Sequence, residues 1–113
     1  MDNRFVDLAP LFHALSDRTR LEVMDRLAER SATVGELAAP TGLRLPTVMK
    51  HLSVLEEAGL ISSEKKGRRR ICSAVPGAMT PLHSWMDAQR DAWEARLARL
   101  DDFVVNSHKD ETE

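Results

Sequence analysis

Apolar residues recur at helical spacing through the first thirty positions of the chain. Residues 5–15 have a near-helical apolar pattern crossed by Pro10, which predicts one helix with Pro10 in its first turn or two short helices. Ser16–Asp17 then offers an N-cap, and a further stripe predicts a helix that ends near Arg30. The stripe consists of Leu21, Val23, Met24 and Leu27.

Two shorter helices are predicted next. Thr33 can cap a helix over residues 34–39, with Glu36 completing a capping box, and Pro40–Gly42 breaks that helix. A second helix starts at about Leu45 and is closed by Gly59. Its inward positions are Val48, Leu52 and Leu55. Two short helices joined by a glycine-containing turn predict a helix-turn-helix.

The periodicity then changes to that of strands. Residues 60–64 and 70–75 are expected to form two strands around a loop over 65–69, in which Gly67 supplies the turn. Five of the six residues from 65 to 70 are cationic, so this hairpin tip is not expected to pack on protein. A helix-turn-helix followed directly by a basic hairpin predicts a winged helix, in a mainly α fold with one small β-hairpin.

The last long apolar stripe predicts a helix over residues 81–105, followed by a polar tail over 107–113. A single winged helix cannot easily cover so long a stripe, so we expect a homodimer formed through the N- and C-terminal helices. The expected interface residues are Phe5, Leu8, Phe12, Trp85, Met86, Trp93, Leu97, Leu100 and Val104. The alternative is that Trp85 and Trp93 belong to the chain's own core.

Length and composition limit the number of domains, the kinds of metal site and the location of the protein. The chain has 113 residues, which suits one domain, expected over 1–106. A single cysteine excludes a disulfide framework and any zinc site that needs two thiolates from one chain. No apolar run reaches the roughly 20 residues of a membrane span, and the first 30 residues are too charged for a signal peptide. We therefore expect a cytoplasmic protein.

Charge is concentrated in the middle of the chain. The net charge is −2, yet residues 44–70 hold seven basic residues against three acidic ones. The remainder holds nine basic and fifteen acidic residues. A basic middle with acidic flanks predicts a polyanionic partner, namely double-stranded DNA, at one localised surface.

Within a winged helix, each polar residue of the second helix gains an expected role. Side chains early in that helix reach bases and phosphates in the major groove, while a basic wing follows the backbone or enters the minor groove. The expected DNA-binding residues are Arg44, Thr47, Lys50, His51, Ser53, Lys65, Lys66, Arg68 and Arg69. Three alternatives stay open: a structural hydrogen bond for His51, a solvated turn for Arg44, and pairing of Arg70 with Glu64 across the hairpin.

Several blocks resemble a known family. "LFHALSDRTRLEVMDRL", "TVGELAAPTGLRLPTVMKHLSVLEEAGLI" and "KKGRRRICSAV" are similar to the ArsR (arsenic-repressor) family of winged-helix repressors. The resemblance covers roughly residues 11–100, and the tail resembles a subgroup without metal motifs. It implies a homodimer that represses its own operon and leaves the DNA when a signal arrives. Members of that subgroup are often encoded beside a START-like lipid- or polyketide-binding protein.

Departures from the family pattern bear on metals. Where the family has a Cys-x-Cys metal site, this chain has residues 34–37 without cysteine. The family's second site uses Asp and His on the final helix, and its Asp-x-His start is missing here although His83, Asp87, Asp91 and Glu94 are present. We therefore expect no metal and no cofactor.

Three single residues complete the expectations. Cys72 is expected to be buried and inert, and His13 to lie at the dimer interface or the surface. Met49 stands where the family usually has a small hydroxyl residue, which removes one expected contact to phosphate or base.

Enzyme activity is not expected. The chain has no Gly-rich phosphate loop, no nucleophile elbow and no His-Glu-x-x-His. The alternative to a DNA-binding regulator is a protein–protein interaction module whose long C-terminal helix dimerises or docks a partner. If the chain is a regulator, its signal could be a small organic molecule bound in a pocket between subunits near Trp85 and Trp93. The sequence does not identify this inducer.

Overall fold

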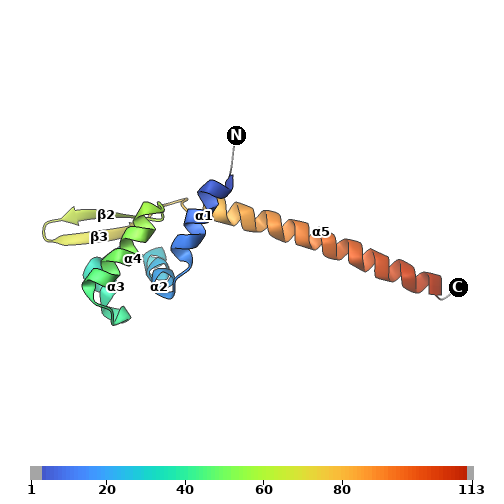
Figure 1. Ribbon diagram of the computed structural model, residues 1–113, viewed down its shortest axis with the longest axis horizontal. Helices are drawn as coiled ribbons and strands as arrows, with labels where there is room; N and C mark the ends of the chain where they lie inside the picture. Colours follow the sequence, from blue (N-terminus) through green and yellow to red (C-terminus); the bar gives the residue numbers. More distant parts are fainter. Residues whose placement is uncertain (1–3, 112–113) are drawn as a thin grey trace. The chain divides into compact units, whose positions relative to one another are not determined.

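The computed structural model describes the backbone of residues 4–111 and the side chains of residues 7–105. Two units are distinguished, Met1–Leu82 and His83–Glu113. The first holds α1 (Arg4–Leu15), α2 (Arg18–Glu29), β1 (Ala32–Thr33), α3 (Val34–Ala38), η1 (Ala39–Thr41), α4 (Leu45–Glu57), β2 (Ile61–Lys66) and β3 (Arg69–Ala74). A long helix, α5 (Thr80–Glu111), begins in the first unit and forms the second (Figure 1).

Local signals begin and end the helices of the first unit. Asp17 caps α2, and its side chain accepts a hydrogen bond from the backbone N–H of Arg20. Thr33 and Glu36 form a reciprocal capping box at the start of α3. Both caps agree with the sequence-based expectation.

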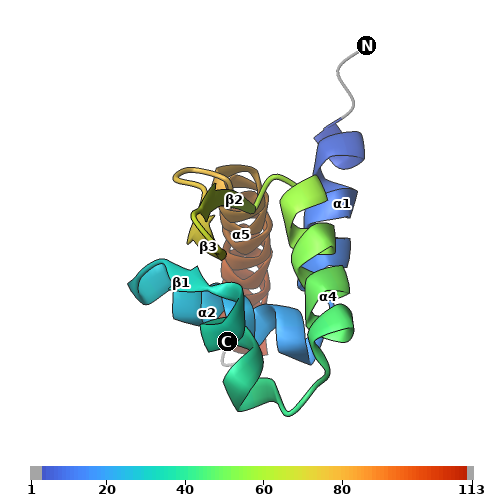
Figure 2. The same ribbon diagram turned by 90° about the vertical axis from the view of Figure 1, so that its left-hand side faces the viewer.

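The core is built from the apolar faces of α1, α2 and α4 against the sheet. Figure 2 shows α1 and α4 side by side, as their contacts require. Val48, Leu52 and Leu55 of α4 point inward as expected. Other buried core residues are Leu8, Leu11, Ala14, Val23, Met24, Leu27, Leu37, Leu60, Ile61, Cys72 and Leu82. Packing of this kind fixes the outward face of α4.

α4 ends in a Schellman motif. The N–H of Leu60 donates to the carbonyl of Leu55 at 3.0 Å, and the N–H of Gly59 donates to that of Glu56 at 3.0 Å. Gly59 has φ +79°, the left-handed conformation that glycine adopts without a steric penalty. Leu55 and Leu60 are both fully buried, so this C-cap is also the hydrophobic link between α4 and β2.

The sheet has three antiparallel strands in the order β1-β3-β2, so the predicted two-stranded hairpin was incomplete. β1 pairs Ala32 with Cys72 and Thr33 with Ile71. A hydrogen bond of 2.6 Å between the hydroxyls of Ser31 and Ser73 extends the same link. The base of the hairpin is thereby tied to the segment between α2 and α3.

Three boundaries differ from the sequence-based expectation. α1 runs continuously through Pro10, which lies neither in the first turn nor at a break. Lys66 pairs with Arg69, so the hairpin turns in two residues and not in five. α5 continues through Glu111, so residues 107–111 of the expected polar tail are helical. The expected single domain over 1–106 stays a prediction.

Candidate nucleic-acid interface

One face of α4 carries the expected DNA-contacting residues. Thr47, Lys50 and Ser53 are exposed on this helix, and Arg44 is exposed at its N-cap position. Val48, Leu52 and Leu55 occupy the opposite, buried face. Because the core fixes the roll of α4, these four polar side chains are all held toward solvent.

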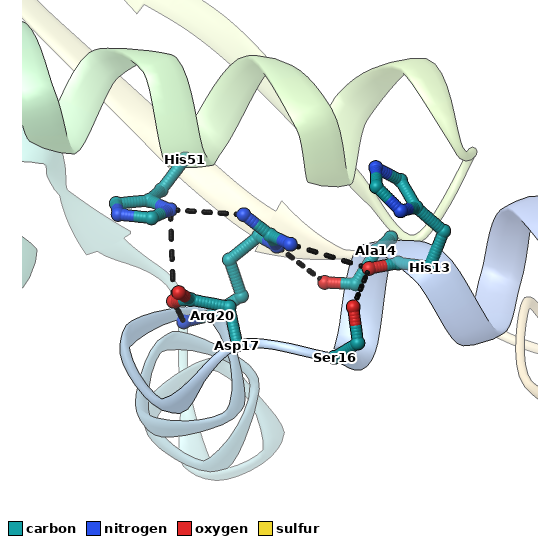
Figure 3. A network of polar contacts seen from close by, with 6 residues as sticks. All are labelled: His13, Ala14, Ser16, Asp17, Arg20 and His51. Atoms are coloured by element: carbon teal, nitrogen blue, oxygen red, sulfur yellow. Dashed lines mark hydrogen bonds and ion pairs between the residues drawn. The ribbon is translucent and has the colours of Figure 1, made fainter.

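His51 differs from these four residues because it is bound within the chain (Figure 3). Its side chain is 19% exposed, and its Nδ1 lies 3.1 Å from Nη1 of Arg20 and 3.6 Å from Oδ2 of Asp17. Arg20 also donates from Nε to the carbonyl of Ala14 at 2.6 Å and from Nη2 to that of His13 at 3.2 Å. The structural hydrogen bond left open as an alternative for His51 is therefore present.

The Arg20 contact selects a tautomer of His51. A guanidinium only donates hydrogen bonds, so the Nδ1 atom that receives it carries the lone pair and Nε2 carries the hydrogen. His51 thus presents Nε2 as a donor when its ring is neutral, which suits a phosphate oxygen or a base acceptor.

Asp17 stays ionised beneath this pair. The hydrogen bond from the backbone N–H of Arg20 holds the pKa of the Asp17 carboxyl below its ordinary value, and the charge of the Arg20 guanidinium acts in the same direction. The link between the start of α2 and the side chain of His51 is the hydrogen bond from Arg20. Through it, the start of α2 positions the middle of α4.

The hairpin tip gathers cations. Lys65, Lys66, Arg68 and Arg69 are all exposed, and Lys66 lies directly opposite Arg69 in the register. Like charges in such cross-strand positions repel one another, so binding of an anionic partner would stabilise this tip. Gly67 has φ +64° while Arg68 does not have positive φ, which is the pattern of a type II′ turn.

Arg70 is oriented differently from the tip. Its Nη1 donates to the hydroxyl of Ser63 at 2.8 Å, and that hydroxyl donates to Oε1 of Glu56 at 3.1 Å. Glu64 lies opposite Ile71 in the register, so the sequence-based alternative of an Arg70–Glu64 pair gives way to this relay. The relay connects the base of the hairpin to the C-terminal part of α4.

A groove of about 610 Å³ joins α4 to the hairpin. Leu45 and Met49 line it from α4, and Arg68, Arg69 and Arg70 line it from the turn and β3. The start of α3, residues 33–36, completes the lining. α4 and the cationic tip therefore border one continuous concave surface, which sequence patterns did not reveal because its two sides are far apart along the chain.

The residues expected at a dimer interface divide into four groups. Large apolar side chains stand exposed on α1 and α5: Phe12, Met86, Trp93, Leu97, Leu100 and Val104. Trp85 is half-buried. Leu8 is only 4% exposed, so it belongs to the core of the single chain and we remove it from the expected interface. The side chain of Phe5 lies outside the described residues.

Two of the four residues considered for metal binding, His83 and Asp87, form ion pairs on α5. His83 Nδ1 lies 3.0 Å from Oδ2 of Asp87, whose Oδ1 pairs with Arg90 at 3.2 Å. Among residues with described side chains, no group of three or more His, Cys, Asp and Glu could hold a metal ion. Cys72 is buried, as expected.

Within the part of the chain that the structure describes, no helix is both long and apolar enough to cross a lipid bilayer.

Comparisons with known proteins agree with this geometry. A family profile described as a helix-turn-helix domain matches residues 15–64. The transcriptional repressor SdpR of Bacillus subtilis is 34% identical over 76 residues, which cover 67% of this chain and 84% of that protein. The family profile covers α2, α3 and α4 and ends within β2.

Solved structures share the fold. The crystal structure of an ArsR family transcriptional regulator, RHA00566, has a TM-score of 0.77 and 39% sequence identity, covering 83% of this chain and 97% of that one. The homodimeric winged helix-turn-helix DNA-binding domain Mb0332 of Mycobacterium bovis has a TM-score of 0.64 and 24% identity, covering 80% of this chain and 88% of that one.

Proposed function

The chain belongs to the ArsR family of helix-turn-helix transcriptional regulators, and from this premise we propose that it is a dimeric repressor of its own operon. It is a DNA-binding transcriptional regulator of mainly helical winged-helix fold, from a family of regulators and not of enzymes. The proposed repressor binds a pseudo-palindromic operator in the cytoplasm and leaves it when a signal arrives. DNA binding by the family disfavours the alternative of a protein–protein interaction module.

The observation that carries the proposal is the groove between α4 and the cationic tip. In the proposed complex α4 lies in the major groove, where Thr47, Lys50 and Ser53 meet bases and phosphates. Arg44 contacts the backbone at the start of the helix. His51 adds its Nε2 donor, and its hydrogen bond to Arg20 keeps the ring oriented.

The hairpin tip acts as the wing in this proposal. Lys65, Lys66, Arg68 and Arg69 contact phosphates beside the major-groove site or enter the adjacent minor groove. Arg70 has no proposed DNA contact, because its guanidinium is bound to Ser63 within the protein. The Ser63–Glu56 bond then keeps the root of the wing close to α4.

Dimerisation would use the apolar residues that remain exposed. Trp93, Leu97 and Leu100 are spaced four and three residues apart on α5, so they share one face of that helix. Burying such a face against a second copy removes it from water, and the exposed Phe12 of α1 is a further proposed contact. The homodimeric Mb0332 supports this assembly by its printed name. A two-fold axis would place two α4 helices about one DNA turn, ~34 Å, apart.

Repression and release complete the proposal. The similar SdpR is named as a transcriptional repressor, which supports the direction of control. Release requires a ligand with higher affinity for the dimer geometry that does not bind DNA, because only differential affinity shifts such an equilibrium.

A DNA-shift titration on the promoter upstream of the chain's own gene tests this function. We expect a promoter-specific shift that weakens by orders of magnitude between low and moderate salt, since several phosphates are contacted per dimer. Random DNA of equal length is the reference, and EDTA is expected to leave the shift unchanged. Equal binding to both DNAs would refute the autoregulatory proposal.

A matched pair of variants tests the wing. Arg68→Glu/Arg69→Glu is expected to abolish the shift while the dimer persists in sedimentation analysis. Arg90→Glu/Arg99→Glu makes the same change in net charge on exposed residues of α5 and is expected to retain the shift. Equal losses in the two variants would mean that overall charge, and not the wing, determines binding.

A further inference from the structure

Apolar side chains are exposed at the start of α4, among the residues proposed to contact DNA. Leu43, Leu45 and Met49 are 39%, 53% and 38% exposed. Leu45 and Met49 are four residues apart, so they lie on one face of the helix, and both line the groove toward the hairpin. They are not part of the buried face formed by Val48, Leu52 and Leu55.

The neighbours of Met49 show what this apolar surface would meet. Lys50 follows Met49, and Ser53 lies one turn later, both exposed on the outer side of α4. Arg68 and Arg69 border the same groove from the hairpin. If these cations and polar groups contact DNA as proposed, Met49 projects from the base-contacting helix into the groove that the phosphate-contacting wing borders.

In the major groove, the group best suited to an apolar side chain in that position is a methyl group. Base edges in the major groove consist of hydrogen-bond donors and acceptors, except for the C5-methyl of thymine. A phosphate gains nothing from a thioether or a leucine side chain. Met has an unbranched and polarisable side chain, which can adapt to the position of a methyl group.

We propose that Met49, supported by Leu45, contacts the C5-methyl of one thymine in each operator half-site and so determines base specificity there. This inference rests on the proposed DNA-binding function. It gives the departure at position 49 a role: an apolar methyl contact in place of the hydroxyl contact that a small residue would make.

The experiment first defines a site and then removes single methyl groups from it. Duplexes bound by the full-length protein are selected from a random-sequence library, and each thymine of the selected site is replaced in turn by deoxyuridine. Dissociation constants are measured by fluorescence anisotropy at one salt concentration. We expect one position per half-site at which deoxyuridine weakens binding about fourfold. This is the change in dissociation constant that corresponds to burying one methyl or methylene group.

Variants assign that loss to a side chain. In Met49→Ser the same deoxyuridine is expected to change binding hardly at all, because the methyl has lost its partner. Met79→Ser is the matched control: Met79 is 40% exposed but does not line the groove, and its variant should keep the fourfold loss.

Three results would overturn the inference: a selected site without thymine, deoxyuridine scanning that leaves wild-type binding unchanged, or an equal methyl dependence in wild type and Met49→Ser. The scan of the wild-type protein decides the matter even if Met49→Ser does not fold. Failure to select any sequence would instead refute the proposed operator binding, and this inference with it.

Discussion

At the level of single residues, Arg20 donates hydrogen bonds to three acceptors, two carbonyls of α1 and Nδ1 of His51. A cationic side chain next to α4, the helix proposed to bind DNA, thus forms its hydrogen bonds within the fold. Sequence patterns placed Asp17 at the start of α2 and left His51 between two roles. They could not identify Arg20 as the partner, because the pair is 31 residues apart and periodicity reports only local neighbours.

Substitution of Cys72 tests how much a buried polar group at this position destabilises the fold. The side chain of Cys72 is 1% exposed, and Cys72→Ser would place a hydroxyl in that buried site. We expect its free energy of unfolding to be lower than that of Cys72→Ala by about 1–3 kcal/mol, the cost of an unsatisfied buried polar group. Urea unfolding of both variants measures this difference. Equal stabilities would show that the serine hydroxyl finds a partner.

The same thiol gives stability a dependence on high pH. Burial raises the pKa of Cys72 above its ordinary value of 9.0, and the charge of Glu56 adds to the effect. A group whose pKa is raised in the folded state contributes stability that is fully present below its ordinary pKa. This stability is lost as the pH rises through the pKa of the folded state. Unfolding of Cys72→Ala should therefore lack this part of the alkaline loss.

At the level of elements, the boundaries that were predicted correctly are those set by residues close together in the chain. The starts of α2 and α3 and the end of α4 were predictable, because Asp17, the Thr33–Glu36 box and Gly59 act within one turn. The two-residue strand β1 was not, because only its pairing with β3 defines it. The hairpin strands extend further than expected, because the tight turn at Gly67 allows cationic residues to continue the ladder.

Two glycines test how α4 and α3 are formed. Gly59→Ala is expected to lower the free energy of unfolding by about 1–2 kcal/mol, since an L-residue is disfavoured at φ +79°. No atom lies within 4 Å of the added Cβ, so the cost is conformational. Gly35→Ala is the control inside α3, where the added Cβ has an ordinary van der Waals contact. This substitution should raise the free energy of unfolding by roughly 0.5–1 kcal/mol. Thermal unfolding should shift in opposite directions, and shifts of equal sign would contradict this account.

At the level of the whole molecule, the candidate DNA surface was largely predictable in its residues and not in its geometry. The charge distribution identified Lys50 and the cationic tip without any structure. The groove that joins them, with Met49 at its side, depends on the packing of α4 against the sheet. Expected interface positions were likewise identified by spacing, but Leu8 shows that an apolar residue can satisfy a helical pattern through the chain's own core.

Assembly can be tested on α5. Leu97→Glu places a charge among the exposed apolar residues Trp93 and Leu100, and we expect the dimer to dissociate at micromolar concentration, as seen by sedimentation. Operator affinity should fall with it, because a monomer reaches one half-site. Ala95→Glu introduces the same charge two residues away, on the other side of the helix, and should remain dimeric. Dissociation of both variants would contradict the proposed face.

The pairing of β1 with β3 has a consequence for how the DNA-binding surface forms. Ser31 and Ser73 are 42 positions apart, and the whole helix-turn-helix lies in the chain between them. The hairpin can form locally, but the third strand joins only after that long loop has closed, and non-local closure is a slow step of folding. Pairing of β1 with β3 therefore joins the segment before α3 to the hairpin, and we expect α4 and the wing to become ordered together in that step.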